Sequence, residues 1–553
     1  MAAAAFPITE GEKRLLRWHL YVAYIAIAVG IFFGLLQVLS RAGLFLDLLR
    51  PWYDYYQGLT FHGVLNALVW TTFNIVALLS LAVRTALGRP LYSLSLGWTG
   101  FGLMTVGVAA AGYAILTRQA NVLYTFYPPL MAHPAFYLGA TLLIVGSWVS
   151  GANLILTYAA WRRENPGRRT PLMAFGSITT FVLWYIATLG VAIEVLFLLL
   201  PWSLGLVRQT NPMLARTLFW YFGHPLVYFW LLPTYVAWYT MVPRLAGGKL
   251  YNDPMARLAF LMLLLFSTPV GLHHQYADPA IGQEWKLVHA FSTFLVATPS
   301  LLTAFNLMAS LEHAGRQRGG RGRIDWIFRL PWGEPAFAGA ALSMIAFIFG
   351  GISGIVNASY NVNLVVHNTS WVPGHFHLTV GTAVTLTFMA MATWMVPYLT
   401  GRALWSRKVA LATMYLWFAG VMIFSTGMMR GGLEGEPRRS NLGFSPYVLP
   451  EWRPFLIMAA VGGTLMFIAG VLFLLNMAMT IWFSKQPAQV EVPMAEALHP
   501  AEDAPWAFER WRVWRAVAAV LIVVAYAPVL RQVLQVSPFS AYGYLPSSAA
   551  PIR

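Results

Sequence analysis

Long apolar stretches, each separated from the next by a short polar segment, recur along the whole 553-residue chain. A helix needs about 20 apolar residues to cross the roughly 30 Å hydrocarbon core of a bilayer. Thirteen stretches of that kind occur, and they begin near residues 18, 61, 91, 134, 173, 217, 255, 286, 335, 366, 408, 453 and 513. The pattern predicts an all-α polytopic membrane protein, a bundle of about 13 transmembrane helices that forms a single transmembrane domain over residues 1–553.

Composition supports this class and restricts the chemistry. Hydrophobic residues make up 58% of the chain and charged residues 10%, with a mean hydropathy of +0.61, which excludes an ordinary soluble domain. The net charge of +16 is spread over the loops, so we expect membrane lipid and no nucleic acid as a partner. The chain has no cysteine, so any bound metal must be held by histidine or oxygen.

The distribution of positive charge predicts the orientation in the membrane. The 36 lysines and arginines divide roughly two to one in favour of the side that holds the N-terminus. Lys13, Arg14 and Arg17 precede the first apolar run, which lacks a cleavage site and is expected to be retained. The N-terminus is therefore predicted to be cytoplasmic and, with an odd number of spans, the C-terminus to lie outside.

Six histidines fall near the outer end of four predicted spans. His375 and His377, spaced i, i+2, point about 200° apart on a helix, so one helix can present partners on two flanks. Ionisable residues inside a span are costly and indicate function. The set is His62, His224, His273, His274, His375 and His377.

The simplest partition of these histidines is one iron with two axial ligands, a second iron with one, and a copper with three. His62 and His377 would hold a low-spin haem with no open position. His375 would hold a high-spin haem whose open side faces a copper on His224, His273 and His274, with O2 between the metals. Tyr228, four residues after His224 and on the same helix face, could supply a proton and an electron to a bound O–O bond.

Positive residues above this layer are candidates for binding the haem propionates. Arg438 and Arg439 are expected to pair with these carboxylates. Weaker candidates for the same polar cap are Arg216, His367, Asn368 and Asp278. An isolated arginine pair would more often be a surface feature, and a lone histidine such as His289 or His313 more often a structural hydrogen-bonding residue.

Two further interpretations concern the helices around the histidines. The first span is predicted to contribute little beyond Gln37. The run Gly350-Gly351-Ile352-Ser353-Gly354 is interpreted as small residues that let helices approach closely.

Taken together, His224-Pro225-x-x-Tyr228, His273-His274 and His375-Phe376-His377 resemble the catalytic subunit I of the haem-copper oxygen reductases, over essentially all thirteen runs. The resemblance implies the same ligand assignments, and it matches Tyr228 to a tyrosine that family members cross-link to a copper histidine.

Within the superfamily the chain is similar to the B-family, the ba-type cytochrome c oxidases. Leu226 stands where many A-family members carry a glutamate, and the eighth run has no lysine after Lys286. This similarity implies a b-type low-spin haem and an a-type high-spin haem. It also implies a proton route to Tyr228 through residues of the sixth and eighth runs, namely Tyr239, Tyr235, Ser300 and Thr303.

The implied function is a terminal respiratory oxidase in the inner membrane of a prokaryote, which reduces O2 to water and translocates protons. Its expected partners are a subunit II with a dinuclear copper site, cytochrome c as donor, and a small additional membrane subunit. A quinol oxidase is the first alternative. A nitric oxide reductase is less favoured because Tyr228 is present and Pro225-Leu226-Val227 has no carboxylate. A transporter or a haem-bearing structural subunit remains a non-enzymatic alternative.

Overall fold

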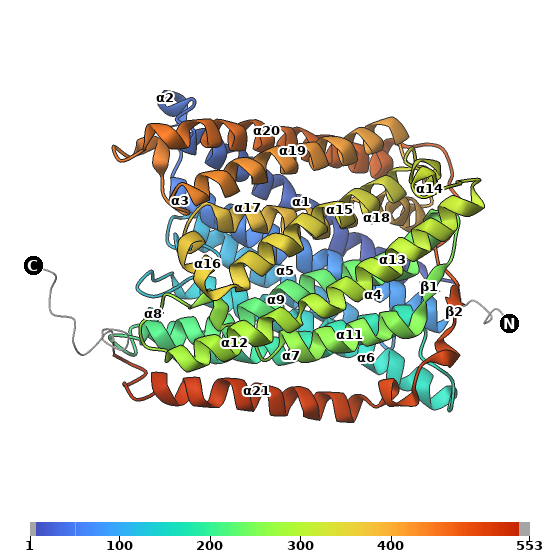
Figure 1. Ribbon diagram of the computed structural model, residues 1–553, viewed down its shortest axis with the longest axis horizontal. Helices are drawn as coiled ribbons and strands as arrows, with labels where there is room; N and C mark the ends of the chain where they lie inside the picture. The colour runs from blue at the N-terminus through green and yellow to red at the C-terminus, as the bar shows by residue number, and fades with distance from the viewer. Residues whose placement is uncertain (1–6, 50, 541–553) are drawn as a thin grey trace, which may run out of the picture.

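The computed structural model describes residues 7–49 and 51–540, and its long helices run roughly along one axis (Figure 1). In this part of the chain, eleven helical segments are long and apolar enough to cross a bilayer. They are Glu10–Arg41 (α1), Tyr55–Leu87 (α3, η1, α4), Leu94–Leu116 (α5), Pro134–Glu164 (α6), Leu172–Ser203 (α7, η2, α8), Gln283–Gln317 (α12, α13), Pro335–Ala358 (α15), Trp371–Thr400 (α17, η4, α18), Arg407–Leu433 (α19), Pro450–Phe483 (η6, α20, η7) and Trp511–Val533 (α21).

The two remaining predicted runs are also helical. They form α9 (Pro212–Thr240) and α11 (Asp253–Ser267), and α11 is short because the residues after it form a loop that carries two of the histidines. The fold class and the approximate number of helices predicted from hydropathy are therefore confirmed.

Several of the long segments are subdivided. Their parts are α3 (Tyr55–Gly63), η1 (Val64–Trp70) and α4 (Thr71–Leu87); α7 (Leu172–Ile193), η2 (Glu194–Leu199) and α8 (Leu200–Ser203); α12 (Gln283–Leu295) and α13 (Ala297–Gln317); α17 (Trp371–Leu378), η4 (Thr379–Val384) and α18 (Thr385–Thr400); η6 (Pro450–Trp452), α20 (Arg453–Ala478) and η7 (Met479–Phe483). The segments η1, η2, η4 and η7 are π-helical turns, a geometry that is frequent at functional sites.

Short elements occupy the connections. They are α2 (Leu46–Leu49), α10 (Val242–Leu245), η3 (Leu272–His274), α14 (Asp325–Arg329), α16 (Tyr360–Val366), η5 (Leu442–Phe444), η8 (Ala501–Asp503) and η9 (Trp506–Glu509). Strands β1 (Leu250–Asn252) and β2 (Ala497–His499) pair in parallel, with Leu250 opposite Ala497. The strands lie at the end of the bundle where α1 begins, and α21 ends at the opposite end (Figure 1).

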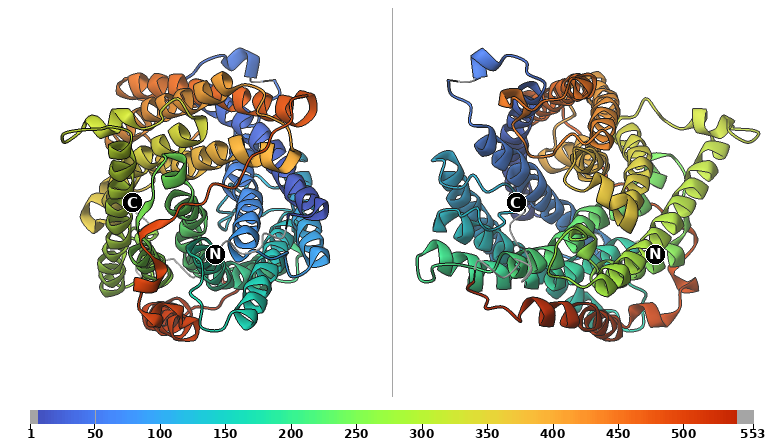
Figure 2. Two further views of the ribbon diagram at one scale, coloured as in Figure 1. Left: turned by 90° about the vertical axis from the view of Figure 1, so that its right-hand side faces the viewer. Right: turned by 60° about the vertical axis from the view of Figure 1, so that its left-hand side comes forward.

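Burial separates a central helix from a peripheral one. In the most apolar window of Trp371–Thr400, 83% of the residues are buried, against 17% in Trp511–Val533. Both views of Figure 2 place α21, in dark red, on the outside of the bundle. The helix that carries His375 and His377 is thus surrounded by protein, as expected for a segment that holds polar ligands inside a membrane.

Glycines let two helix pairs pack with their backbones in contact. A Cβ added to Gly107 of α5 would lie 2.5 Å from the Gly139 carbonyl oxygen of α6, and one on Gly427 of α19 would lie 2.7 Å from the Phe455 carbonyl oxygen of α20. Helices in a membrane associate mainly through such close packing, because lipid tails are as apolar as the helix surfaces.

This packing yields a prediction for α5. Gly107→Ala should destabilise the protein by about 1–3 kcal/mol, because the added methyl group overlaps the backbone of α6. Gly102→Ala, in the same helix but with open space around the new methyl group, serves as the control. Thermal unfolding in detergent checks this, and equal midpoints for the two variants would contradict the role of Gly107.

Candidate metal centre

His62 and His377 face each other across a cavity of about 250 Å³. His62 is on α3, immediately before the turn η1, and His377 is on α17, immediately before η4. Their ring centroids are 5.9 Å apart and the ring planes differ by 13°. Two nearly parallel imidazoles on opposite walls can ligate one iron from both sides.

Backbone carbonyls fix which nitrogen of each ring is available. The Nδ1 atom of His62 lies 2.9 Å from the Gly30 carbonyl oxygen, and that of His377 lies 2.7 Å from the Pro373 carbonyl oxygen. A carbonyl can only accept, so each Nδ1 carries the proton and donates. The Nε2 atoms are left as the basic nitrogens that a metal requires.

The first span is more important than the sequence analysis predicted. A Cβ on Gly34 of α1 would lie 2.7 Å from Nδ1 of His62, and Gly30 of the same helix supplies the carbonyl that orients this ring. The interpretation of this span as carrying little beyond Gln37 was therefore wrong. The four-residue spacing of Gly30 and Gly34, typical of close helix contacts, was the signal available in the sequence.

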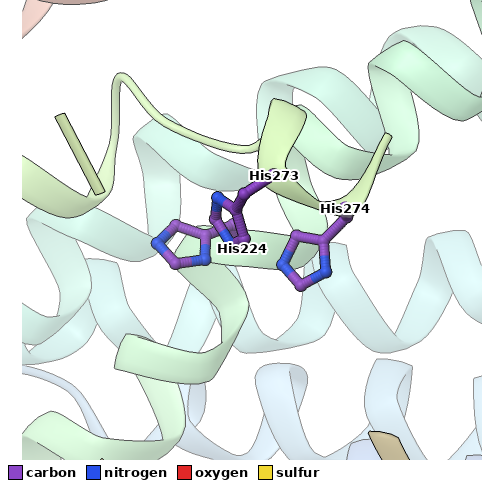
Figure 3. A group of neighbouring side chains, drawn as sticks. All are labelled: His224, His273 and His274. Atoms are coloured by element: carbon purple, nitrogen blue, oxygen red, sulfur yellow. The ribbon is translucent and has the colours of Figure 1, made fainter. Parts of the chain in front are cut away.

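A second group joins α9 to the loop after α11. The candidate ligand atoms of His224, His273 and His274 all lie within 4.8 Å of one another. Figure 3 shows the three rings side by side, one from α9 and two from the turn η3. The Nε2 atoms of His224 and His274 are buried and have no hydrogen-bond partner within the described residues. Buried polar atoms normally have a partner, so these two are suited to bind a metal.

Neighbouring side chains hold these rings. The Trp220 ring stacks on His274 with centroids 3.7 Å apart and planes 7° apart. The Thr293 hydroxyl oxygen lies 3.0 Å from Nδ1 of His273. Three neutral imidazoles without a thiolate suit copper, and the residues present fit such an ion.

The side chain of His375 points away from α17 in a different direction from that of His377 and contacts a different neighbour. Its Nδ1 lies 2.9 Å from the Ser353 hydroxyl of α15, and a Cβ on Gly354 would lie 3.3 Å from its Cε1. The two side chains therefore occupy different flanks, as the i, i+2 spacing predicts. The small residues of α15 do more than permit close packing, because one of them orients a candidate ligand.

Tyr228 lies beside the three-histidine group. Its ring contacts His224 edge to face, with centroids 5.1 Å apart and planes 68° apart. The aromatic ring of Tyr228 thus lies against one of the three candidate ligands.

Arginines bring positive charge to the large cavity. Arg438 and Arg439 both line it. Arg438 donates to the Asn368 side-chain oxygen at 2.8 Å, and the Arg439 guanidinium lies 5.8 Å from the ring of Tyr124. Burial, together with the charge of Arg439, lowers the pKa of Arg438 to about 9. An anion bound here would relieve that repulsion, so the pair suits a carboxylate ligand.

The remaining candidates of the polar cap lie near these arginines, but they differ in their partners and in their charge. Arg216 forms an ion pair with Asp278 at 2.9 Å. His367 contacts the Asn363 side-chain oxygen at 3.2 Å through Nδ1. Burial and the charge of Arg438 lower the pKa of His367 to about 4, which keeps this ring neutral near pH 7.

Hydroxyl groups pair between α9 and α13. Tyr235 donates to the Ser300 hydroxyl at 3.4 Å, and Tyr239 donates to the Thr303 hydroxyl at 2.5 Å. The rings of Tyr235 and Tyr239 are 5.8 Å apart. These contacts bring together the four residues that the resemblance places on a proton route.

Comparison with known proteins gives the same interpretation. The family model described as "Cytochrome C and Quinol oxidase polypeptide I" matches residues 14–465. The chain belongs to this family. It is the catalytic subunit of a haem-copper oxidase, as the histidine motifs predict.

Individual relatives of this oxidase subunit cover most of its length. Cytochrome c oxidase subunit 1 of Thermus thermophilus is 44% identical over 94% of this chain and 95% of its own. Quinol oxidase subunit 1 of Sulfolobus acidocaldarius is 26% identical over 78% of this chain and 83% of its own. A cryo-EM structure of a heme-copper terminal oxidase dimer is 43% identical, with a TM-score of 0.90 and coverage of 95% of this chain and 93% of that one.

The contact between α1 and His62 yields a prediction. Gly34→Val should displace the His62 ring and thereby broaden or shift the absorbance of the low-spin haem, because the new side chain occupies the space of the imidazole. Gly351→Val, at a helical glycine with open space, is the control. Reduced-minus-oxidised difference spectra of the purified protein measure the effect. Unchanged low-spin bands in Gly34→Val would contradict it.

Proposed function

We propose that this oxidase subunit holds two haems and one copper ion and reduces O2 to water, with electrons arriving from outside and protons from the cytoplasm. The observation that carries the proposal is the arrangement of the six histidines. Four of them have Nδ1 engaged by a carbonyl or hydroxyl, which leaves Nε2 available, and the other two have a buried Nε2 without a partner among the described residues.

The geometry supports three ligand sets. His62 and His377 would hold a low-spin haem, His375 a high-spin haem, and the three-histidine group copper. When bound, iron and copper would supply O2 binding and electrons, and the protein contributes spacing and ligation. In agreement with the B-family similarity, we propose a b-type low-spin haem and an a-type high-spin haem.

The other residues of the site act on protons and charge. Tyr228, whose ring contacts that of His224, would hold a proton at its phenol oxygen for the bound O2. Tyr239, Thr303, Tyr235 and Ser300 would pass protons toward it, since hydroxyls can both donate and accept. Arg438 and Arg439, with His367 nearby, would bind the propionates and hold the low-spin haem in the cavity.

The partners are proposed from the relatives. The relative that is 44% identical is named a cytochrome c oxidase and the quinol oxidase relative is 26% identical, so a quinol donor is not favoured. We propose a subunit II with a dinuclear copper site that receives electrons from cytochrome c, and a small additional membrane subunit. The N-terminus would face the cytoplasm across a prokaryotic inner membrane, as the positive-inside pattern predicts.

Metal analysis tests the ligand scheme. The purified wild-type protein should contain two haems and one copper. His375→Ala should abolish the carbon monoxide-binding spectrum and O2 uptake, because the high-spin iron loses its protein ligand, and it should keep the low-spin bands. Metal content, optical spectra and O2 consumption with a reduced donor measure these. An unchanged carbon monoxide spectrum, or non-haem iron in place of copper, would exclude the scheme, the latter in favour of a nitric oxide reductase.

The hydroxyl contacts give a separate prediction. Tyr239→Phe should lower steady-state O2 reduction about tenfold or more, since the group that donates to Thr303 is removed while the ring still packs. Tyr415→Phe, which removes a peripheral hydroxyl bound to the Trp332 carbonyl, is the control. Equal turnover in the two variants would show that protons take another path.

A further inference from the structure

The loop between α11 and α12 carries His273 and His274 but has little structure of its own. Its regular part is the single turn η3, closed by the hydrogen bond from the His274 amide to the Gly271 carbonyl at 3.1 Å. One such turn cannot fix two ligands inside a bundle. The position of the pair must therefore depend on contacts from neighbouring elements.

His289 of α12 makes such contacts with both ring nitrogens. Its Nδ1 accepts the backbone amide of Gly271 at 3.3 Å and approaches that of Leu272 at 3.5 Å. Its Nε2 lies 3.2 Å from the Ala525 carbonyl of α21 and donates to it. A single neutral tautomer, with the proton on Nε2, makes all of these contacts. His289 is 1% exposed, and its ring connects the start of the loop between α11 and α12 to the peripheral helix α21.

The backbone of His289 supports the same loop by a second route. The Thr293 hydroxyl donates to the His289 carbonyl at 2.6 Å. Its oxygen is then free to accept from Nδ1 of His273, 3.0 Å away. The ring of His289 thus contacts the loop backbone, while its backbone carbonyl, which any residue at this position would supply, orients Thr293 toward a candidate ligand.

Helix α21 lies on the far side of this bridge and is connected to both ends of the loop. Pro528 lacks the amide that would donate to the Val524 carbonyl in the helical ladder, so the carbonyl next to that of Ala525 lacks its usual helical donor. At the other end of the loop, the Gly282 amide donates to the Gln532 side chain at 3.1 Å. The Tyr526 ring of α21 also contacts His289 edge to face, at 5.2 Å.

We propose that α21 supports the copper site from the outside of the bundle and that His289 is the positioning residue through which it acts. We call this supporting role of α21 the splint. The helix contributes no ligand, and it is the least buried of the candidate spans. It packs on α7, α9 and α11 as well, and its C-terminal half reaches both ends of the loop that presents two of the three ligands, through His289 at one end and Gln532 at the other. The inference rests on the proposed function in one respect, that the three-histidine group holds copper.

The role requires one acceptor and one donor on a single side chain. Glutamine offers both, since its amide has an oxygen and an NH2 group, whereas phenylalanine fills the space and offers neither. His289→Gln should therefore retain the bridge, and His289→Phe should remove it. His19 provides a matched control, because it is also 1% exposed, donates to the Leu15 carbonyl at 2.9 Å and packs on Phe73, away from the metal group.

The test is retention of copper by the purified, haem-loaded oxidase against increasing concentrations of a copper chelator, with metal content measured per iron. Loss of a residue that orients a ligand typically lowers metal affinity about 10- to 100-fold. His289→Phe should release copper at correspondingly lower chelator concentrations. His289→Gln and His19→Phe should behave as wild type. The low-spin haem spectrum, which does not depend on copper, reports folding.

The outcomes separate the two proposals. Wild-type copper retention by His289→Phe, or an equal loss in His19→Phe, would overturn the splint. Wild-type protein without copper would overturn the proposed function and the splint with it. If His289→Phe yields no haem-loaded protein, Gln532→Leu decides: weaker copper retention supports the splint and unchanged retention overturns it.

Discussion

The structure depends on how an apolar bundle accommodates buried imidazoles. A polar ring placed among hydrocarbon is costly unless its N–H group finds an acceptor. Here the acceptors are supplied by neighbouring elements: the Gly30 carbonyl for His62, the Pro373 carbonyl for His377, the Ser353 hydroxyl for His375 and the Thr293 hydroxyl for His273. In each case Nδ1 is used and Nε2 remains. The location of the acceptors therefore determines which nitrogens face the metal positions.

The same constraint explains what the sequence could and could not reveal. Spans were predictable because hydropathy is local, and ligands were predictable because histidine is rare inside a membrane and its i, i+2 spacing has a fixed geometry. The spacing of Gly30 and Gly34 could indicate a close helix contact, but the hydrogen bonds that the supporting groups make to the ligands were not predictable. Gly30 contributes a backbone atom and Ser353 a small side chain, and neither is chemically distinctive. Their roles exist only once α1 approaches α3 and α15 approaches α17.

Span boundaries show a similar limit. The eighth run was expected to be one helix, yet it divides at Val296 into α12 and α13, with His289 and Thr293 on the first part and Ser300 and Thr303 on the second. Hydropathy does not detect this division, since both parts are apolar. The division matters because α12 contacts the loop that carries His273 and His274, whereas α13 faces the tyrosines of α9.

A buried ion pair positions the charged residues of the cap, and the hydropathy pattern does not reveal this pair either. Arg41, at the end of α1, pairs with Glu436 and donates to the Ser440 carbonyl at 2.9 Å and the Pro437 carbonyl at 3.1 Å. It thereby holds both sides of the segment that carries Arg438 and Arg439. Removing one member of such a pair leaves an uncompensated buried charge, so the pair fixes a geometry more than it adds stability.

The cap and the ligand helix are consequently one unit. The Ser370 amide donates to the Glu436 carbonyl at 2.7 Å, and the Arg438 amide donates to the Asn368 carbonyl at 2.9 Å, so the residues just before α17 pair with the arginine segment. A shift of α17 would move His377 and the arginines in the same direction. A haem held by His377 and by Arg438 would keep both contacts during such a shift. The backbone pairing thus preserves the relation between an axial ligand and a carboxylate-binding group, which separate side chains on independent loops could not do.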